Sequence, residues 1–203
     1  MYTNGSGYEG QIGAAAVLTV NRLELRRVRY RLGPETQHTV YKAEIFAVVL
    51  ALHLLTQVTR PIPRVTIGLD NQAVLLGLKN QRTKPSHYLL DKVHDTLEDL
   101  QVMEARKRGK TVPGYRLGKG KLKLDNSTRG WKNWNLKRRC KIKFVWMPRH
   151  EKIEGNEMAD EEAKLAVMEG SSVKAKLPAW VHHKDLPTSI SATQQKLRGD
   201  VKE

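Results

Sequence analysis

The first third of the chain changes from strand-like to helix-like patterns of apolar residues. Glycines punctuate the start, and the apolar run AAAVLTV at residues 14–20 follows them, which predicts two strands joined by a tight turn. A third strand is expected over residues 23–32, where arginines alternate with apolar residues and Pro34 ends the run. Over residues 41–58 the apolar positions fall at helical spacing, which predicts an amphipathic helix.

The remaining chain continues this alternation. The run VTIGL at residues 65–69 is short and rich in β-branched residues, which predicts a buried strand, and helical patterns follow over residues 73–78 and 86–100. A β-rich run returns at residues 141–147, and a helix with alanines on one side is predicted over residues 157–168. This order of elements predicts an α/β fold in which helices flank a mixed sheet.

Charge divides the chain into a nearly neutral body and one basic segment. The 203 residues carry a net charge of +15, and 15 basic residues against the single acid Asp125 lie between Arg106 and Lys143. Because this segment is rich in Gly and Lys and has no sustained periodicity, we interpret residues 106–140 as a basic insertion before the last strand. It indicates a polyanionic partner, most simply nucleic acid, although a solvated insertion without a partner has the same composition.

Composition and length set the expected class of protein. The mean hydropathy is -0.54 and no apolar run is long enough to span a bilayer, so no membrane association is expected. The N-terminus shows no secretory signal and the single cysteine, Cys140, cannot form an intrachain disulfide, which predicts an intracellular protein of the nucleus or cytoplasm that is not secreted. We expect one domain over residues 1–169 and a flexible tail over residues 170–203, in which Ser189 or Ser191 caps a short helix. The absence of a heptad pattern predicts a monomer.

Three carboxylates stand at positions where strands and helices meet. Glu44 is expected in the first turn of the first helix, Asp70 at the carboxyl end of the buried strand, and Asp160 on the last helix. Each has a simple explanation alone: Glu44 and Asp160 as acids that complement a helix dipole, and Asp70 as an N-cap. Together in one cleft they would repel each other unless a divalent cation neutralised them, and oxygen ligands favour Mg²⁺ or Mn²⁺. Beside a polyanion-binding surface, such a cluster indicates metal-assisted phosphodiester hydrolysis.

Four sequence blocks carry a resemblance to a known family. YTNGSG at residues 2–7, YKAEIFAVVLAL at 41–52, IGLDNQAVLLGL at 67–78 and WMPRHEKIEGNEMADEEAKLA at 146–166 resemble, in order and spacing, the motif blocks of type 1 ribonuclease H. The chain resembles in particular the ribonuclease H domains of fungal non-LTR retrotransposon polyproteins. The resemblance implies a five-stranded mixed sheet and an endonuclease that cuts the RNA strand of RNA/DNA hybrids with two Mg²⁺ ions, for which Mn²⁺ can substitute.

The four acids of that family map onto Asn4, Glu44, Asp70 and Asp160, and the first of them differs. In the family an aspartate at the position of Asn4 bridges both metal ions, while Glu44 and Asp70 complete the shell of one ion and Asp160 holds the other. Asn4 keeps an oxygen but loses the charge, and its amide nitrogen is a donor. We therefore expect weakened metal binding and strongly slowed cleavage, with hybrid binding retained.

Two origins of Asn4 stay open at this point: a substitution made to trap substrate, and a natural variant in a domain kept for binding. Two other functions also stay open. The chain could be a catalytically inactive module that binds RNA/DNA hybrid or double-stranded RNA, or a relative of transposases and integrases, against which the GNEMAD run and the placement of Glu44 argue.

Further positions match family residues that lie near the substrate. His150 corresponds to the family's mobile histidine, which helps proton transfer or product release, and the alternative is an exposed loop histidine without a role. Arg149 stands where the family usually has glycine. Nucleic-acid contacts are implied for Gly5, Ser6, Thr39, Gln72, Arg149 and Asn156. A role as ordinary polar residues at helix starts would explain Thr39 and Gln72 equally well. In the basic insertion, aromatic side chains between cations suggest stacking on bases beside phosphate contacts. The residues expected to bind there are Trp131, Trp134, Lys137, Arg138 and Arg139.

Overall fold

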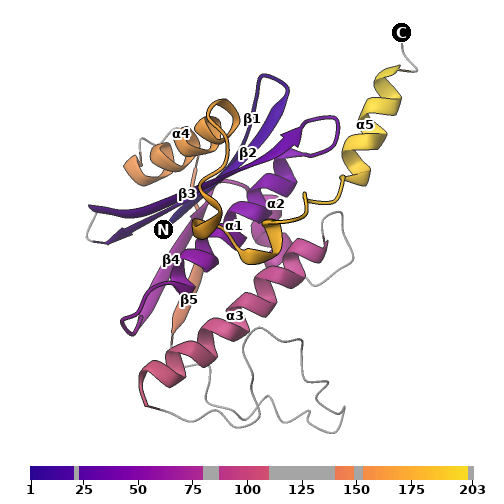
Figure 1. Cartoon of the computed structure of the whole chain (residues 1–203). Coiled ribbons are helices and arrows are strands. Elements are labelled where there is room, and N and C mark those ends of the chain that lie inside the picture. The colour runs from indigo at the N-terminus through magenta and orange to yellow at the C-terminus, as the bar shows by residue number, and fades with distance from the viewer. Residues whose placement is uncertain (21–22, 80–86, 110–139, 149–152, 201–203) are drawn as a thin grey trace, which may run out of the picture.

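A five-stranded mixed sheet forms the middle of the computed structural model, which describes residues 1–20, 23–79, 87–109, 140–148 and 153–200 (Figure 1). The strands are β1 (Tyr2–Tyr8), β2 (Gln11–Val20), β3 (Leu23–Pro34), β4 (Arg64–Leu69) and β5 (Lys141–Trp146). Their order in the sheet is β3-β2-β1-β4-β5. The first three strands are antiparallel, and β4 pairs in parallel with both β1 and β5. The predicted α/β fold with a five-stranded mixed sheet is confirmed.

Helices cover both faces of the sheet (Figure 1). The long helix α1 (Val40–Thr56) packs on β1 and β2, with α2 (Gln72–Lys79) and α3 (His87–Lys107) beside it, whereas α4 (Glu154–Met168) covers the opposite face. Two short 3-10 helices, η3 (Lys174–Lys176) and η4 (Ala179–Val181), precede α5 (Ile190–Asp200). No helix among the described residues is both long and apolar enough to cross a membrane.

Strand β2 is buried on both faces, which explains its uninterrupted apolar sequence. Alternate residues from Ala14 to Leu18 belong to the core on the α1 side. Gly13 faces α4, and a Cβ atom added to it would lie 2.1 Å from the backbone oxygen of Ala163. The side chains that α4 buries completely are alanines: Ala159, Ala163 and Ala166. Small residues on both partners therefore let α4 approach the sheet closely.

The segment after Gly170 follows the free edge of the sheet. The hydroxyls of Ser171 and Ser172 accept hydrogen bonds from the backbone N–H groups of Arg31 and Arg29 on the edge strand β3, at 2.9 and 3.0 Å. The Ser172 N–H donates in return to the Arg29 carbonyl at 2.9 Å. These bonds satisfy backbone groups that an edge strand otherwise leaves exposed.

Farther along, this segment contributes to the hydrophobic core. The residues of this segment that belong to the core are Leu177, Val181 and Leu186. The sequence predicts a flexible tail from residue 170, whereas the structure packs part of it on the core. The prediction misses this packing because the apolar residues are separated by Pro, His and Lys and follow neither a helical nor a strand period. The short helix expected after Ser189 is confirmed as α5, which extends away from the body of the molecule (Figure 1). The domain boundary at residue 169 stays a prediction.

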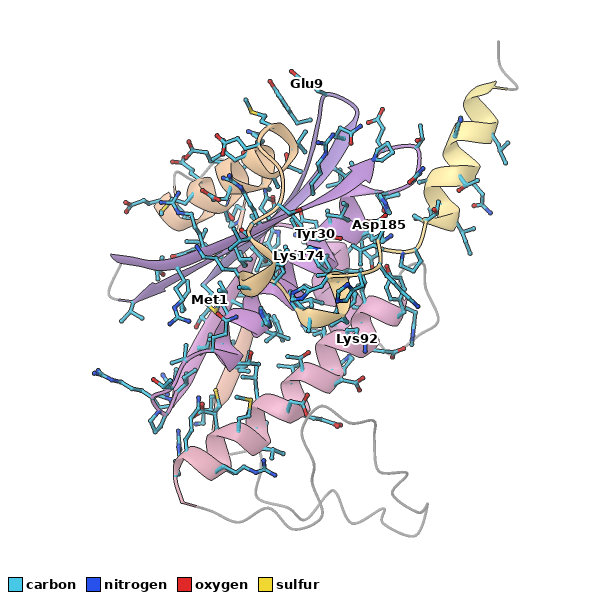
Figure 2. All side chains as sticks on the ribbon, viewed as in Figure 1. Met1, Glu9, Tyr30, Lys92, Lys174 and Asp185 are labelled. Atoms are coloured by element: carbon cyan, nitrogen blue, oxygen red, sulfur yellow. The ribbon has the colours of Figure 1, made fainter. Side chains whose placement is uncertain are left out.

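A fully buried lysine ties α1 to the same segment. Lys42 Nζ lies 2.8 Å from His38 Nδ1 and also donates to the carbonyl oxygen of Pro187. Burial lowers the pKa of Lys42 to about 8, and burial together with the Lys42 charge lowers the pKa of His38 to about 4. Figure 2 shows Asp185 of this segment near Tyr30 of β3, where burial and then the Asp185 charge raise the pKa of the tyrosine. Because the Lys42 ammonium donates to His38 Nδ1, that nitrogen carries no proton and the His38 imidazole is neutral.

We expect His38 to make the protein less stable in mild acid. Its pKa is about 4 in the folded chain and 6.5 when exposed. The unfolded chain therefore binds more protons between these values, so the free energy of unfolding is highest above pH 6.5 and falls as the pH drops towards 4. Urea unfolding at about pH 7 and about pH 4.5 measures this loss. The loss should be smaller for His38→Gln, whose amide oxygen still accepts from Lys42, and an equal loss in both proteins would contradict the expectation.

Candidate active site

Strands β1 and β4 place Asn4 and Asp70 next to each other. The two strands pair in parallel with Thr3 opposite Leu69, and the Thr3 hydroxyl donates to the Gly68 carbonyl at 3.1 Å. Asn4 and Asp70 are the next residues along each strand direction, and Asn4 is 3% exposed. The register therefore brings the carboxyl end of β4 beside the middle of β1, as expected for Asp70.

Gly5 allows α1 to bring Glu44 close to the same point of β1. A Cβ atom on Gly5 would lie 2.5 Å from the Glu44 backbone nitrogen and 2.8 Å from the Ala43 carbonyl carbon. Glu44 itself is completely buried. The expectation that Glu44 lies in the first turn of its helix is wrong, because α1 begins at Val40. Asp160 also lies beyond the first turn of α4, so neither acid serves to complement a helix N-terminus.

Asp70 is not the N-cap of the helix that follows it. The side-chain oxygen of Asn71 accepts from the backbone N–H groups of Ala73 and Val74 at 3.0 and 3.3 Å, so Asn71 caps α2. The backbone carbonyl of Asp70 accepts from the Trp146 indole at 3.2 Å, which joins the ends of β4 and β5. The simple explanation of Asp70 as a helix cap therefore does not hold.

Asn4 connects β1 to α4 through Asp160. Asn4 Nδ2 donates to Asp160 Oδ1 at 2.6 Å, and Lys164 Nζ lies 2.6 Å from Asp160 Oδ2. The atom that faces the carboxylate has to be the amide nitrogen, because an amide oxygen at this distance would be repelled. Both carboxylate oxygens of Asp160 are thus engaged by groups of the chain itself. Asn4 Oδ1 is buried and has no hydrogen-bond partner among the described residues.

A comparison with known families identifies the lineage of this site. The RNase H family matches the chain over residues 1–168, a range that includes Asn4, Glu44, Asp70 and Asp160. The chain belongs to the RNase H family. No curated protein matches the chain.

Three solved structures to which the chain is similar carry RNase H in their titles. RNase H1 from the halophilic archaeon Halobacterium salinarum is 15% identical, with a TM-score of 0.49 over 83% of this chain and 96% of that one. LC11-RNase H1 in complex with RNA/DNA hybrid is 17% identical, with a TM-score of 0.44 over 82% and 96%. The N-terminal RNase H domain of a Mycobacterium tuberculosis protein, fused to maltose-binding protein, is 14% identical, with a TM-score of 0.43 over 82% and 94%.

The site of this RNase H chain suits divalent cations only in part. Family members generally use such ions, and the carboxylates of Glu44 and Asp70 are the oxygen ligands that Mg²⁺ prefers. Asn4, however, turns a donor towards Asp160, whose second oxygen is paired with Lys164. Within the part of the chain that the structure describes, no three His, Cys, Asp or Glu side chains are grouped so that they could hold a metal ion. The arrangement does not fit the two ions that the resemblance implies.

Lys164 is the residue of this site that the sequence analysis missed. It follows Asp160 by four residues on α4, a spacing that places two side chains on the same face of a helix. An acid followed four residues later by a lysine on a predicted helix is a signal present in the sequence. The sequence alone does not show that the acid of this pair also contacts a residue on β1.

The other predicted contact residues have varied surroundings in the RNase H fold. Thr39 caps α1 by accepting from the Lys42 N–H at 3.2 Å, Gln72 is exposed at the start of α2, and Ser6 is half-buried on β1. Asn156 Oδ1, near the start of α4, is buried without a hydrogen-bond partner among the described residues. Their roles in nucleic-acid binding stay predictions. Seven predicted residues lie outside the described residues: Trp131, Trp134, Lys137, Arg138, Arg139, Arg149 and His150.

Proposed function

We propose that this chain is an RNase H domain that binds RNA/DNA hybrid and whose endonucleolytic cleavage of the RNA strand is strongly impaired by Asn4. Membership of the RNase H family supports the reaction class, hydrolysis of RNA in hybrids with divalent metal ions. The observation that carries the impairment is the 2.6 Å hydrogen bond from the Asn4 amide to Asp160.

The physical reason for the impairment is the loss of negative charge where two dications would have to lie close together. Two divalent ions about 4 Å apart repel each other strongly, and carboxylates between them offset that repulsion. Asn4 contributes no charge, and its amide N–H occupies a carboxylate oxygen of Asp160 that would otherwise be free to bind a cation. We infer that Mg²⁺ and Mn²⁺ bind this site weakly.

The Asn4→Asp variant is expected to cleave a labelled RNA/DNA hybrid about 100-fold faster or more than the chain itself, which corresponds to about 3 kcal/mol of barrier. The measurement is single-turnover cleavage in Mg²⁺ and in Mn²⁺, with single-stranded RNA and double-stranded DNA as substrate controls. Hybrid binding, measured in parallel by fluorescence anisotropy, should change little. The matched control is the double variant Asn4→Asp with Asp70→Asn, which removes a second acid and should be inactive again.

The alternative is a module that binds hybrid or double-stranded RNA without cutting it. The engagement of Asp160 by both Asn4 and Lys164 favours this alternative, because restoring one aspartate leaves the lysine in place. Tight hybrid binding without cleavage by either protein would select it. Equal cleavage by the chain and by Asn4→Asp would show instead that Asn4 causes no impairment.

We also propose the setting in which the domain acts. The motif blocks support a domain of the type found in fungal non-LTR retrotransposon polyproteins, which works inside the cell as a monomer. The basic segment at residues 106–140 would supply additional phosphate contacts to the hybrid. His150 would assist proton transfer in the Asn4→Asp variant.

A further inference from the structure

Asp160 is held from two sides by groups that compensate its negative charge. On the inner side is the amide of Asn4, whose residue is 3% exposed. On the outer side is the ammonium of Lys164, whose side chain is 47% exposed, while that of Asp160 is 41% exposed. The two contacts have the same length, 2.6 Å, and end on different oxygens of one carboxylate. The carboxylate therefore lies between a buried donor and a cation.

The Lys164–Asp160 pair alone would carry no special meaning. An exposed ion pair at this spacing on a helix contributes little to stability, because water screens it. The difference here is the third member, since Asn4 belongs to β1 and lies 156 residues earlier in the chain. The row of Asn4, Asp160 and Lys164 thus joins the central strand to α4, and the Asp160 charge is balanced by a neighbouring cation of the same chain.

We propose that Asn4 and Lys164 together take the place of a divalent cation at Asp160, so that β1 and α4 stay joined without metal. This inference rests on the proposed function in one respect, namely that Asn4 stands where the family has a metal-binding aspartate. Lys164 is a positioning residue in this arrangement: it holds Asp160 and competes with any cation for the same carboxylate oxygen.

Two consequences separate this arrangement from an ordinary surface ion pair. The folded chain should gain little stability from Mg²⁺, because Asp160 is already compensated and the site binds the ion weakly. Replacing Asn4 by aspartate should reverse this, because two carboxylates would then face each other at hydrogen-bond distance with only the Lys164 charge beside them. A divalent cation would stabilise that variant by binding only its folded state.

The test is the melting temperature of the full chain and its variants at about pH 8, in EDTA and in about 10 mM Mg²⁺. We expect the Tm of the chain to be nearly the same in both solutions. Asn4→Asp should melt about 5 °C lower in EDTA and recover about half of this loss in Mg²⁺. The matched control is Gln11→Glu on β2, which makes the same amide-to-carboxylate exchange beside Arg31, and its Tm should not depend on Mg²⁺.

Competition by Lys164 is measured by Mn²⁺ binding, followed by electron paramagnetic resonance. Adding Lys164→Gln to Asn4→Asp should tighten Mn²⁺ binding at least about fivefold, because one positive charge about 4 Å from a divalent ion costs about 2 kcal/mol in water before salt screens it. The same exchange at the exposed Lys196 on α5 should leave the affinity unchanged. An effect of Lys164 on folding alone would not change Mn²⁺ affinity in this way.

The inference is overturned if Mg²⁺ raises the Tm of the chain as much as that of Asn4→Asp, or if Lys164→Gln leaves Mn²⁺ affinity unchanged. Neither readout depends on cleavage. A Tm that becomes Mg²⁺-dependent in an Asn4→Asp protein that does not cut hybrid would support the inference and refute the proposed enzyme. Cleavage by Asn4→Asp with a Tm insensitive to Mg²⁺ would do the opposite.

Discussion

A chain that ends at Gly170 is expected to lose most of its stability, although the family match itself ends at residue 168. The removed segment contributes the buried side chains of Leu177, Val181 and Leu186 to the core. Burying an aliphatic side chain of this size contributes about 1.5–3 kcal/mol, so the three together contribute about 5–9 kcal/mol. The free energy of unfolding of a domain is about 5–15 kcal/mol in total, so we expect the truncated chain to be unfolded or only marginally folded.

The truncation also removes polar partners. Lys42 is fully buried and donates to the Pro187 carbonyl, so the shorter chain would leave a buried ammonium with one hydrogen bond fewer. Strand β3 would lose the hydroxyls of Ser171 and Ser172 along its edge. Buried groups without their partners cost more than the bonds themselves contribute. These losses act in the same direction as the lost apolar burial.

The measurement is urea unfolding followed by circular dichroism, with a chain that ends at Ser189 as the matched control. That control lacks α5, whose large apolar side chains, Ile190 and Leu197, are 75% and 58% exposed and whose buried Ala192 is small, so its midpoint should lie much closer to that of the full chain than the midpoint of the shorter chain does. Equal midpoints for both truncated chains would show that the segment between Gly170 and Ser189 does not stabilise the fold. Leu186→Ala in the full chain should by itself cost about 2–5 kcal/mol.

The sequence predicts the sheet and its helices well because their apolar residues are periodic or continuous. The apolar run at residues 14–20 predicts the strand that the structure shows as β2, and the spacing over residues 41–58 predicts α1 to within a few residues. The segment after Gly170 has no such pattern, since its buried residues follow a path set by the surfaces of α1 and the sheet edge. Its packing therefore depends on contacts with residues distant in the sequence, which a local pattern of apolar residues does not predict.

The candidate site could be predicted only as a set of residues. Ordered motif blocks identify Asn4, Glu44, Asp70 and Asp160, and the parallel register of β1 and β4 explains why two of them meet. The direction of the Asn4 amide could not be predicted from the sequence, because it depends on the distance between α4 and β1. Lys164 could be paired with Asp160 by spacing alone, but its place in a row that reaches the central strand required the structure.

Two glycines control how closely the helices that carry the site approach the sheet. The nucleic-acid contact implied for Gly5 stays a prediction. In the structure the side of Gly5 where a Cβ atom would lie is filled by the backbone of α1 at Ala43 and Glu44. Gly13 has the corresponding place under α4, where the nearest atom is the Ala163 carbonyl oxygen. The distance from Asn4 to Asp160 therefore depends on the absence of a side chain at Gly13.

Gly13→Ala is expected to destabilise the protein by about 3 kcal/mol or more. The added Cβ would lie 2.1 Å from the Ala163 oxygen and 3.1 Å from the Ala166 Cβ. A flexible side chain could move aside at low cost, but a carbonyl inside a helix cannot move without the helix. Helix α4 would therefore shift away from β2, and Asp160 would move away from Asn4.

Urea unfolding measures the stability loss, and Gly7→Ala is the matched control because it makes the same exchange in a neighbouring strand. A Cβ on Gly7 would meet Val40 and Ile12 at 3.4 and 3.5 Å, which is ordinary contact. That variant should be neutral or up to about 1 kcal/mol more stable, since alanine loses less backbone freedom on folding. If both variants unfolded at the same urea concentration, the close approach of α4 to the sheet would not be what holds Asp160 against Asn4. A loss confined to Gly13→Ala would instead tie the geometry of the site to a glycine on a strand that carries none of its acids.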